Sequence, residues 1–99
     1  MKSKRTKALA ITKTVKDKVF QRDGGRCILC GSIQGLPEAH YIPRSQGGLG
    51  IEENIVTTCR LCHDRLDHTA ERPALLERVK RHLILWYPDF SDTERVYKK

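Results

Sequence analysis

The sequence is poor in the residues that build a large apolar core. Its 99 residues include one Trp, one Met and two Phe, and aromatic residues make up only 6% of the chain. No apolar run approaches the roughly 18 residues that would indicate a membrane-spanning helix, and none of signal-peptide length follows the basic N-terminus. We therefore expect one small intracellular, cytoplasmic domain in which something besides apolar burial supports the fold.

Acidic residues are scarce in the first quarter of the chain. Residues 1–26 hold nine Lys and Arg against Asp17 and Asp23, so they carry the whole net charge of +7. A basic segment on a neutral remainder favours attraction to a polyanion, nucleic acid first and an anionic membrane surface second. A solubilising tail is the alternative. The residues of this segment that we expect to contact nucleic acid are Lys2, Lys4, Arg5, Lys7 and Lys13.

The four cysteines form two closely spaced pairs, Cys27-x2-Cys30 and Cys59-x2-Cys62. In a reducing compartment such cysteines are typically metal ligands rather than disulfides. Two CxxC turns can bring four thiolates into a tetrahedron around zinc, and this closed ligand set indicates a structural site. Two unrelated buried pairs, or a redox CxxC, are the alternatives.

The pattern of apolar residues predicts a mixture of helices and short strands. Residues 1–11 are too charged to pack and are expected to form a flexible basic arm. The helix expected at 71–87 carries an apolar stripe that should cover the core; the alternative is that the stripe forms a dimer face. Residues 89–99 are expected to be loose, which leaves a domain at 12–88. The predicted elements are helices at 12–22, 59–69 and 71–87, strands at 36–42 and 54–58, and a glycine-rich loop at 44–50.

Three segments, read in order, resemble the HNH endonuclease family. They are EAHYIPRSQGG at 38–48, ENIV at 53–56, and CRLCH at 59–63. The resemblance covers about residues 24–68, with the cysteine pairs placed as in the four-cysteine zinc subclass, and it is strongest to phage or prophage proteins. It implies an α+β fold: a small zinc-stabilised ββα-metal (His-Me finger) core with flanking N- and C-terminal helices.

The resemblance also implies roles for three side chains. His40, at the end of the first strand, would activate water, Asn54 would brace the loop that holds His40, and His63 would bind a catalytic divalent ion. Imidazole suits the first role because it titrates near neutral pH. One helical turn after His63, Asp67 is a second candidate ligand, with a solvated helix charge as the alternative. Its oxygens suit Mg²⁺ or Mn²⁺, with Zn²⁺ or Ni²⁺ as further candidates.

Two positions in the first segment bear on how the site would work. Ala39 stands where the family commonly has a histidine or aspartate ligand, so His63 and Asp67 remain the expected ligands. Glu38 would join them only if the strand twists at its end, because by alternation it shares a face with His40. Arg44 follows the strand and is a candidate phosphate contact, with an ordinary surface arginine as the alternative.

Two functions of different classes fit these residues. The first is a metal-dependent endonuclease that hydrolyses DNA phosphodiester bonds with His40 as general base. The second is a non-catalytic nucleic-acid-binding zinc module derived from an HNH fold. The expected partners are DNA and either a second copy of the chain or a phage packaging assembly, without a membrane. Retention of His40, Asn54, His63 and Asp67 favours the nuclease, because binding alone requires none of them.

Overall fold

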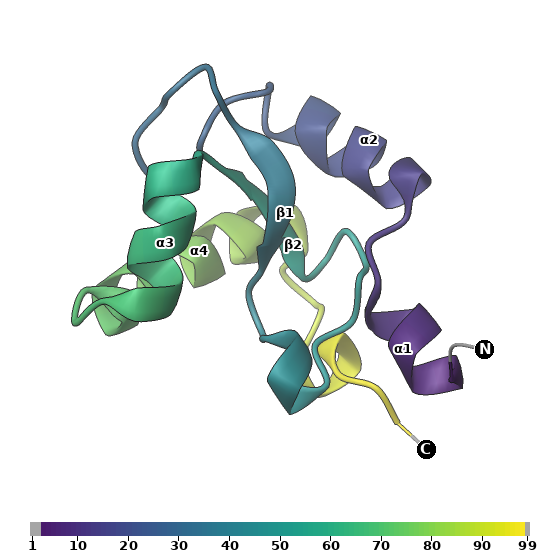
Figure 1. The fold of residues 1–99 in the computed structure, drawn as a ribbon. Helices are drawn as coiled ribbons and strands as arrows, with labels where there is room; N and C mark the ends of the chain where they lie inside the picture. Colours follow the sequence, from purple (N-terminus) through teal and green to yellow (C-terminus); the bar gives the residue numbers. More distant parts are fainter. Residues whose placement is uncertain (1–2, 99) are drawn as a thin grey trace.

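Two short antiparallel strands lie at the centre of the structure, a computed structural model that describes residues 3–98 (Figure 1). Strand β1 spans Leu36–His40 and strand β2 spans Ile55–Thr58. Ala39 pairs with Val56 and His40 with Ile55, and the register shifts between Leu36 and Ala39. Because β2 is buried along its whole length, helices must cover the pair.

Helices cover the two strands from opposite sides, as Figure 1 shows for α2 on one side and α3 and α4 on the other. Helix α2 spans Lys13–Arg22, and Thr12 caps it by accepting a hydrogen bond from the Val15 N–H. Helix α3 spans Arg60–His68 and directly follows β2, which completes the ββα unit. Helix α4 spans Arg72–Trp86 and packs against α3. The expected α+β fold with flanking helices is therefore confirmed.

The apolar core lies between the strands, α3 and α4. Leu75, Val79 and Leu83 recur at intervals of four along α4 and are all buried, as the predicted stripe requires. Trp86, the last residue of α4, is 52% exposed because it lies beyond the core. None of the helices formed by residues 3–98 has both the length and the apolar character needed to cross a bilayer.

The N-terminal segment differs from the expected flexible arm. Helix α1 spans Lys4–Leu9, with Ser3 as its cap, and Leu9 is only 2% exposed. Apolar burial of Leu9 anchors a helix that is otherwise basic and solvated, which the charge of the segment concealed. Lys2, one of the expected nucleic-acid contacts, lies outside the described residues.

The C-terminal segment is packed rather than loose. A 3₁₀ helix, η2, spans Asp92–Arg95, and Arg95 is 3% exposed although it is charged. The Arg95 guanidinium donates to the carbonyls of Glu53 and Phe90 and pairs with Asp92. These bonds satisfy the buried charge and attach the segment to the loop between the strands. That loop contains a short 3₁₀ helix, η1, at Arg44–Gln46.

Candidate functional site

The four cysteines meet at the end of the strand pair, where the turn before β1 approaches the start of α3. Their sulfur atoms all lie within 4.8 Å of one another. A tetrahedron with zinc–sulfur distances of about 2.3 Å requires sulfurs about 3.8 Å apart, and the Cys30 and Cys59 sulfurs are 3.6 Å apart. The residues therefore form a structural metal site whose donor set fits zinc.

The surroundings of the sulfurs also favour a bound cation. The Cys27 and Cys59 sulfurs each accept a backbone N–H, from Cys30 and Cys62. Burial raises the pKa of both the Cys27 and the Cys62 thiol, but backbone N–H bonds bring the pKa of Cys27 down to about 7, whereas the neighbouring sulfurs raise that of Cys62 further. Four thiolates therefore do not accumulate at this separation unless a cation offsets their repulsion, as a structural metal does.

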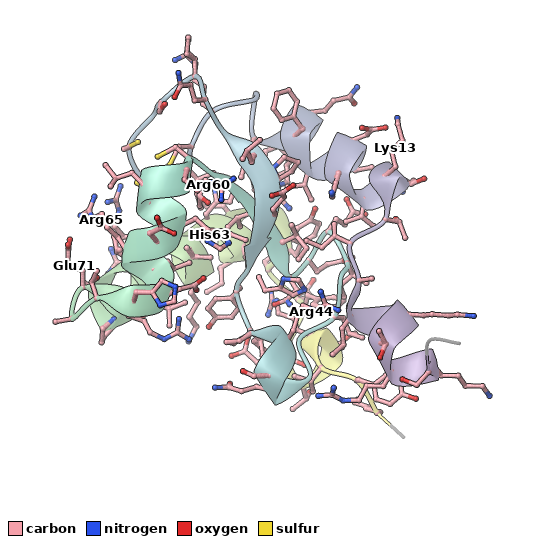
Figure 2. All side chains as sticks on the ribbon, in the orientation of Figure 1. Lys13, Arg44, Arg60, His63, Arg65 and Glu71 are labelled. Carbon is pink, nitrogen blue, oxygen red and sulfur yellow. The ribbon has the colours of Figure 1, made fainter. Side chains whose placement is uncertain are left out.

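A second group of predicted residues lines an open cleft of about 520 Å³. His40 borders the cleft from β1, and His63 and Asp67 border it from α3. Figure 2 shows His63 on the side of α3 that faces the strands, whereas Arg65 and Glu71 lie on the opposite side and form an ion pair. The strand pair and the helix thus bring together side chains that are more than twenty residues apart in the sequence.

His40 is half-buried and is bonded to the N-terminal segment. Its Nε2 lies 3.0 Å from the Leu9 carbonyl oxygen. Burial lowers the pKa of His40, and the positive charge of Arg44 acts in the same direction; the bond to Leu9 raises the pKa, but the net shift is downward. A lowered pKa keeps the imidazole neutral at physiological pH, as a proton acceptor must be.

Asn54 is fully buried and is bound to the loop between the strands. Its Oδ1 accepts the Ile42 N–H at 2.9 Å, and its Nδ2 donates to the carbonyls of Ile42 and Leu49 at 3.2 and 2.9 Å. One side chain therefore joins the first residues after β1 to the far end of the loop. Because Ile42 is two residues after His40, these bonds restrain the chain that carries it.

His63 and Asp67 lie one helical turn apart and face each other. The His63 Nδ1 and an Asp67 carboxylate oxygen are 3.4 Å apart, and both side chains are about 40% exposed. Within residues 3–98, the cysteine set is the only group of three or more ligand side chains close enough to share an ion. A metal held by His63 and Asp67 would therefore take its remaining ligands from water or substrate.

Ala39 and Glu38, the two residues before His40 on β1, lie in different surroundings. Ala39 is 1% exposed and belongs to the apolar core, so this position offers packing in place of a ligand. Glu38 lines the cleft with His63, and its carboxylate lies 3.6 Å from the Lys16 ammonium. Lys16 thereby brings a positive charge from α2 to the cleft.

Of the expected nucleic-acid contacts that the structure describes, only Arg44 is among the residues that line the cleft. Arg44 borders it (Figure 2), and Lys4, Arg5 and Lys7 are exposed on α1. The Arg5 guanidinium donates to the Arg44 carbonyl, which ties α1 to the loop after β1. Lys13 is also exposed, but it pairs with Asp17 one turn along α2.

Sequence reasoning missed a buried polar cluster behind β2. Asp23, whose side chain is fully buried, accepts hydrogen bonds from Arg22, His82 and the Thr57 N–H. Burial would raise the pKa of Asp23, but the His82 and Arg22 bonds outweigh it and hold the pKa well below its usual range. Asp23 and His82 are 59 residues apart, so no local pattern in the sequence joins them.

Comparison with known families adds one finding. A family profile described as HNH endonuclease matches residues 27–78, which is just over half of the chain. The chain belongs to the HNH endonuclease family. In this HNH protein the matched segment contains both cysteine pairs and all three cleft residues, and it begins after α1 and α2. No curated protein matches the chain. The family supports a nuclease-type hydrolase in general.

Proposed function

We propose that this HNH protein is a metal-dependent endonuclease that hydrolyses phosphodiester bonds of DNA. The observation that carries the proposal is the shared cleft, which His40 borders from one side and the His63–Asp67 pair from the other. A proton acceptor and a metal-binding pair on opposite walls suit a phosphate held between them. The open shape of the cleft is compatible with a polymer substrate that enters from solvent.

His40 would act on the attacking water. The water proton moves to the imidazole, the water oxygen bonds to phosphorus, and the bond from phosphorus to the leaving oxygen breaks. The leaving oxygen then takes a proton from solvent. Positioned general bases contribute about 10²- to 10⁴-fold to rate. Asn54 would support the step indirectly, because its bonds to Ile42 and Leu49 restrain the loop beside His40.

His63 and Asp67 would hold the catalytic divalent ion. One imidazole nitrogen and one carboxylate oxygen form an open ligand set without thiolates. Such a set fits Mg²⁺ or Mn²⁺ better than the closed four-thiolate site does. When bound, such an ion offsets the negative charge that develops on the phosphate and the leaving oxygen. Zn²⁺ and Ni²⁺ are further candidates, since imidazole binds both.

The cations around the cleft would bind the DNA backbone. Arg44 lies on the rim, and Lys4 and Lys7 extend the positive surface along α1. Such contacts to phosphate position a duplex without reading its sequence. The N-terminal basic segment would thus act as a structured extension of the cleft rather than as a free arm. We expect the protein to work in the cytoplasm, where it would meet DNA.

A cleavage assay separates this proposal from a non-catalytic binding module. Supercoiled plasmid is incubated with the zinc-loaded protein and Mg²⁺ or Mn²⁺, alongside His40→Ala and His68→Ala. His68 is an exposed histidine at the end of α3 that does not line the cleft, so it is the matched control. We expect the wild type and His68→Ala to cleave and His40→Ala to be inactive. DNA binding without cleavage by the wild type would favour the binding module.

A further inference from the structure

The N-terminal segment packs against the part of the chain that carries the cleft. The buried Leu9 side chain anchors it, and the Gly50 N–H donates to the Ala8 carbonyl at 3.0 Å. The approach is close enough that a Cβ on Gly50 would overlap the Ala10 carbonyl. Helix α1 lies outside the segment matched by the family profile, whereas His40 and Gly50, which it contacts, lie inside that segment.

The docking places a free main-chain acceptor at His40. Leu9 is the last residue of α1, and the carbonyls of a helix's last turn have no partner within the helix. The Leu9 oxygen instead lies 3.0 Å from His40 Nε2. A carbonyl oxygen only accepts, so the ring nitrogen that faces it must carry the hydrogen. In the neutral ring, the lone pair is then on Nδ1.

The other ring nitrogen remains available. Within residues 3–98, the bond to Leu9 is the one hydrogen bond that the His40 ring makes, and Nδ1 is not among the buried polar atoms left without a partner. Nδ1 therefore has access to solvent on a side chain that borders the cleft. A water molecule in the cleft can donate to it.

We infer that Leu9 is a positioning residue for His40: its carbonyl fixes the Nε2–H tautomer and thereby makes Nδ1 the atom that accepts the proton from water. The proton that Nδ1 gains leaves an imidazolium whose Nε2–H still donates to Leu9. Helix α1 is on this account part of the catalytic apparatus as well as a carrier of positive charge. The inference rests on the proposed role of His40, but the tautomer can be measured without activity.

The first measurement is the tautomer itself. A long-range ¹H–¹⁵N NMR correlation on the ¹⁵N-labelled, zinc-loaded full chain, at a pH where His40 is neutral, distinguishes the two tautomers, and His40→Ala identifies its signals. We expect protonated Nε2 and unprotonated Nδ1. The opposite tautomer in the folded protein would overturn the inference, whatever the variants do.

The second measurement displaces the carbonyl. Leu9→Asp places a charge in the buried anchor and should undock α1, whereas Leu9→Met keeps both the anchor and the carbonyl. We expect Leu9→Asp to lose the fixed tautomer and about 10- to 100-fold in kcat at saturating DNA, by analogy with the loss of groups that orient a functional histidine. KM for a DNA duplex should rise as well, because α1 also carries Lys4 and Lys7, so kcat is the value compared. Leu9→Met should keep both the wild-type tautomer and the wild-type kcat.

Val79→Ala is the control for lost stability, because Val79 is a fully buried core residue of α4 that does not line the cleft. It should weaken the core yet keep the tautomer and kcat. A folded Leu9→Asp protein with wild-type tautomer and kcat would overturn the inference. Cleavage that persists in His40→Ala would instead refute the proposed function and leave the measured tautomer standing.

Discussion

Replacing Asp23 with alanine should be among the most destabilising single changes that leave the zinc ligands intact. The carboxylate is fully buried and accepts from His82 at 2.7 Å, from two nitrogens of Arg22 at 2.8 and 3.0 Å, and from the Thr57 N–H at 2.9 Å. Asp23→Ala would leave the Arg22 guanidinium, whose side chain is 5% exposed, without its counter-charge. Removing one partner of a buried ion pair costs about 3–5 kcal/mol.

A loss of that size is large for a domain of this length. It corresponds to a fall of roughly 20 °C in Tm, at about 4–8 °C per kcal/mol for domains of 60–100 residues. Asp17→Ala is the matched control, because Asp17 pairs with Lys13 on the surface, where such pairs contribute at most about 1 kcal/mol. Urea unfolding of the zinc-loaded proteins, followed by circular dichroism, measures both. A free energy of unfolding for Asp23→Ala within about 1 kcal/mol of the control would refute the reasoning.

The same carboxylate predicts how stability depends on pH. The pKa of Asp23 in the folded protein lies below its ordinary value of about 4, because the His82 and Arg22 bonds outweigh burial. Its contribution is therefore fully present above about pH 4 and is lost as the pH falls towards the folded-state pKa. The wild type should lose stability below about pH 4 more steeply than Asp23→Ala. Parallel pH curves for the two proteins would contradict this.

Three further predictions concern the metals and DNA. Cys30→Ser should leave an unfolded chain without zinc, because a four-thiolate site supplies folding free energy on the order of 10 kcal/mol; elemental analysis with circular dichroism tests this, and a folded zinc-free variant would contradict it. His63→Ala should lose cleavage but keep one zinc per chain and its fold, whereas loss of zinc would assign His63 to the cysteine site. Lys4→Ala with Lys7→Ala should reduce the slope of log affinity against log salt by about 0.9 for each phosphate that is no longer neutralised, and an unchanged slope would exclude both lysines from the interface.

Much of the ββα core could be predicted because its determinants are local. Glycines mark the end of α2, β-branched residues mark β2, and the spacing from His63 to Asp67 fixes a shared helix face. The cysteine spacing likewise predicts the metal site, which needs only two turns brought together. In each case a few neighbouring residues determine the geometry.

The terminal segments could not be predicted because their structure depends on distant partners. Leu9 is one apolar residue in a basic segment, and its burial becomes evident only when His40 and Gly50 lie beside it. Arg95 is buried because carbonyls of Glu53 and Phe90 receive it, which composition cannot reveal. In both cases the charge of the segment predicted a solvated tail, whereas long-range hydrogen bonds hold the segment against the rest of the fold.

The candidate site was predicted as a set of residues but not as a geometry. The sequence order suggested His40, Asn54 and His63, and the structure adds where each side chain lies relative to the cleft and what each one contacts. The Leu9 carbonyl is a main-chain group, so no residue type in the sequence indicates its contact with His40. The roles of these residues remain predictions that cleavage experiments must test.

The proposed base is tested most directly by separating binding from chemistry in His40→Ala. Cleavage rates of a DNA duplex under single-turnover conditions with Mg²⁺ or Mn²⁺ are compared with the Kd of the same duplex in Ca²⁺, which holds substrate without supporting rapid cleavage in many nucleases. Because His40 would act on water rather than on DNA, we expect the rate to fall by about 10²- to 10⁴-fold while the Kd stays close to that of the wild type. A rate that survives the substitution, or a parallel loss of rate and affinity, would contradict His40 as the general base.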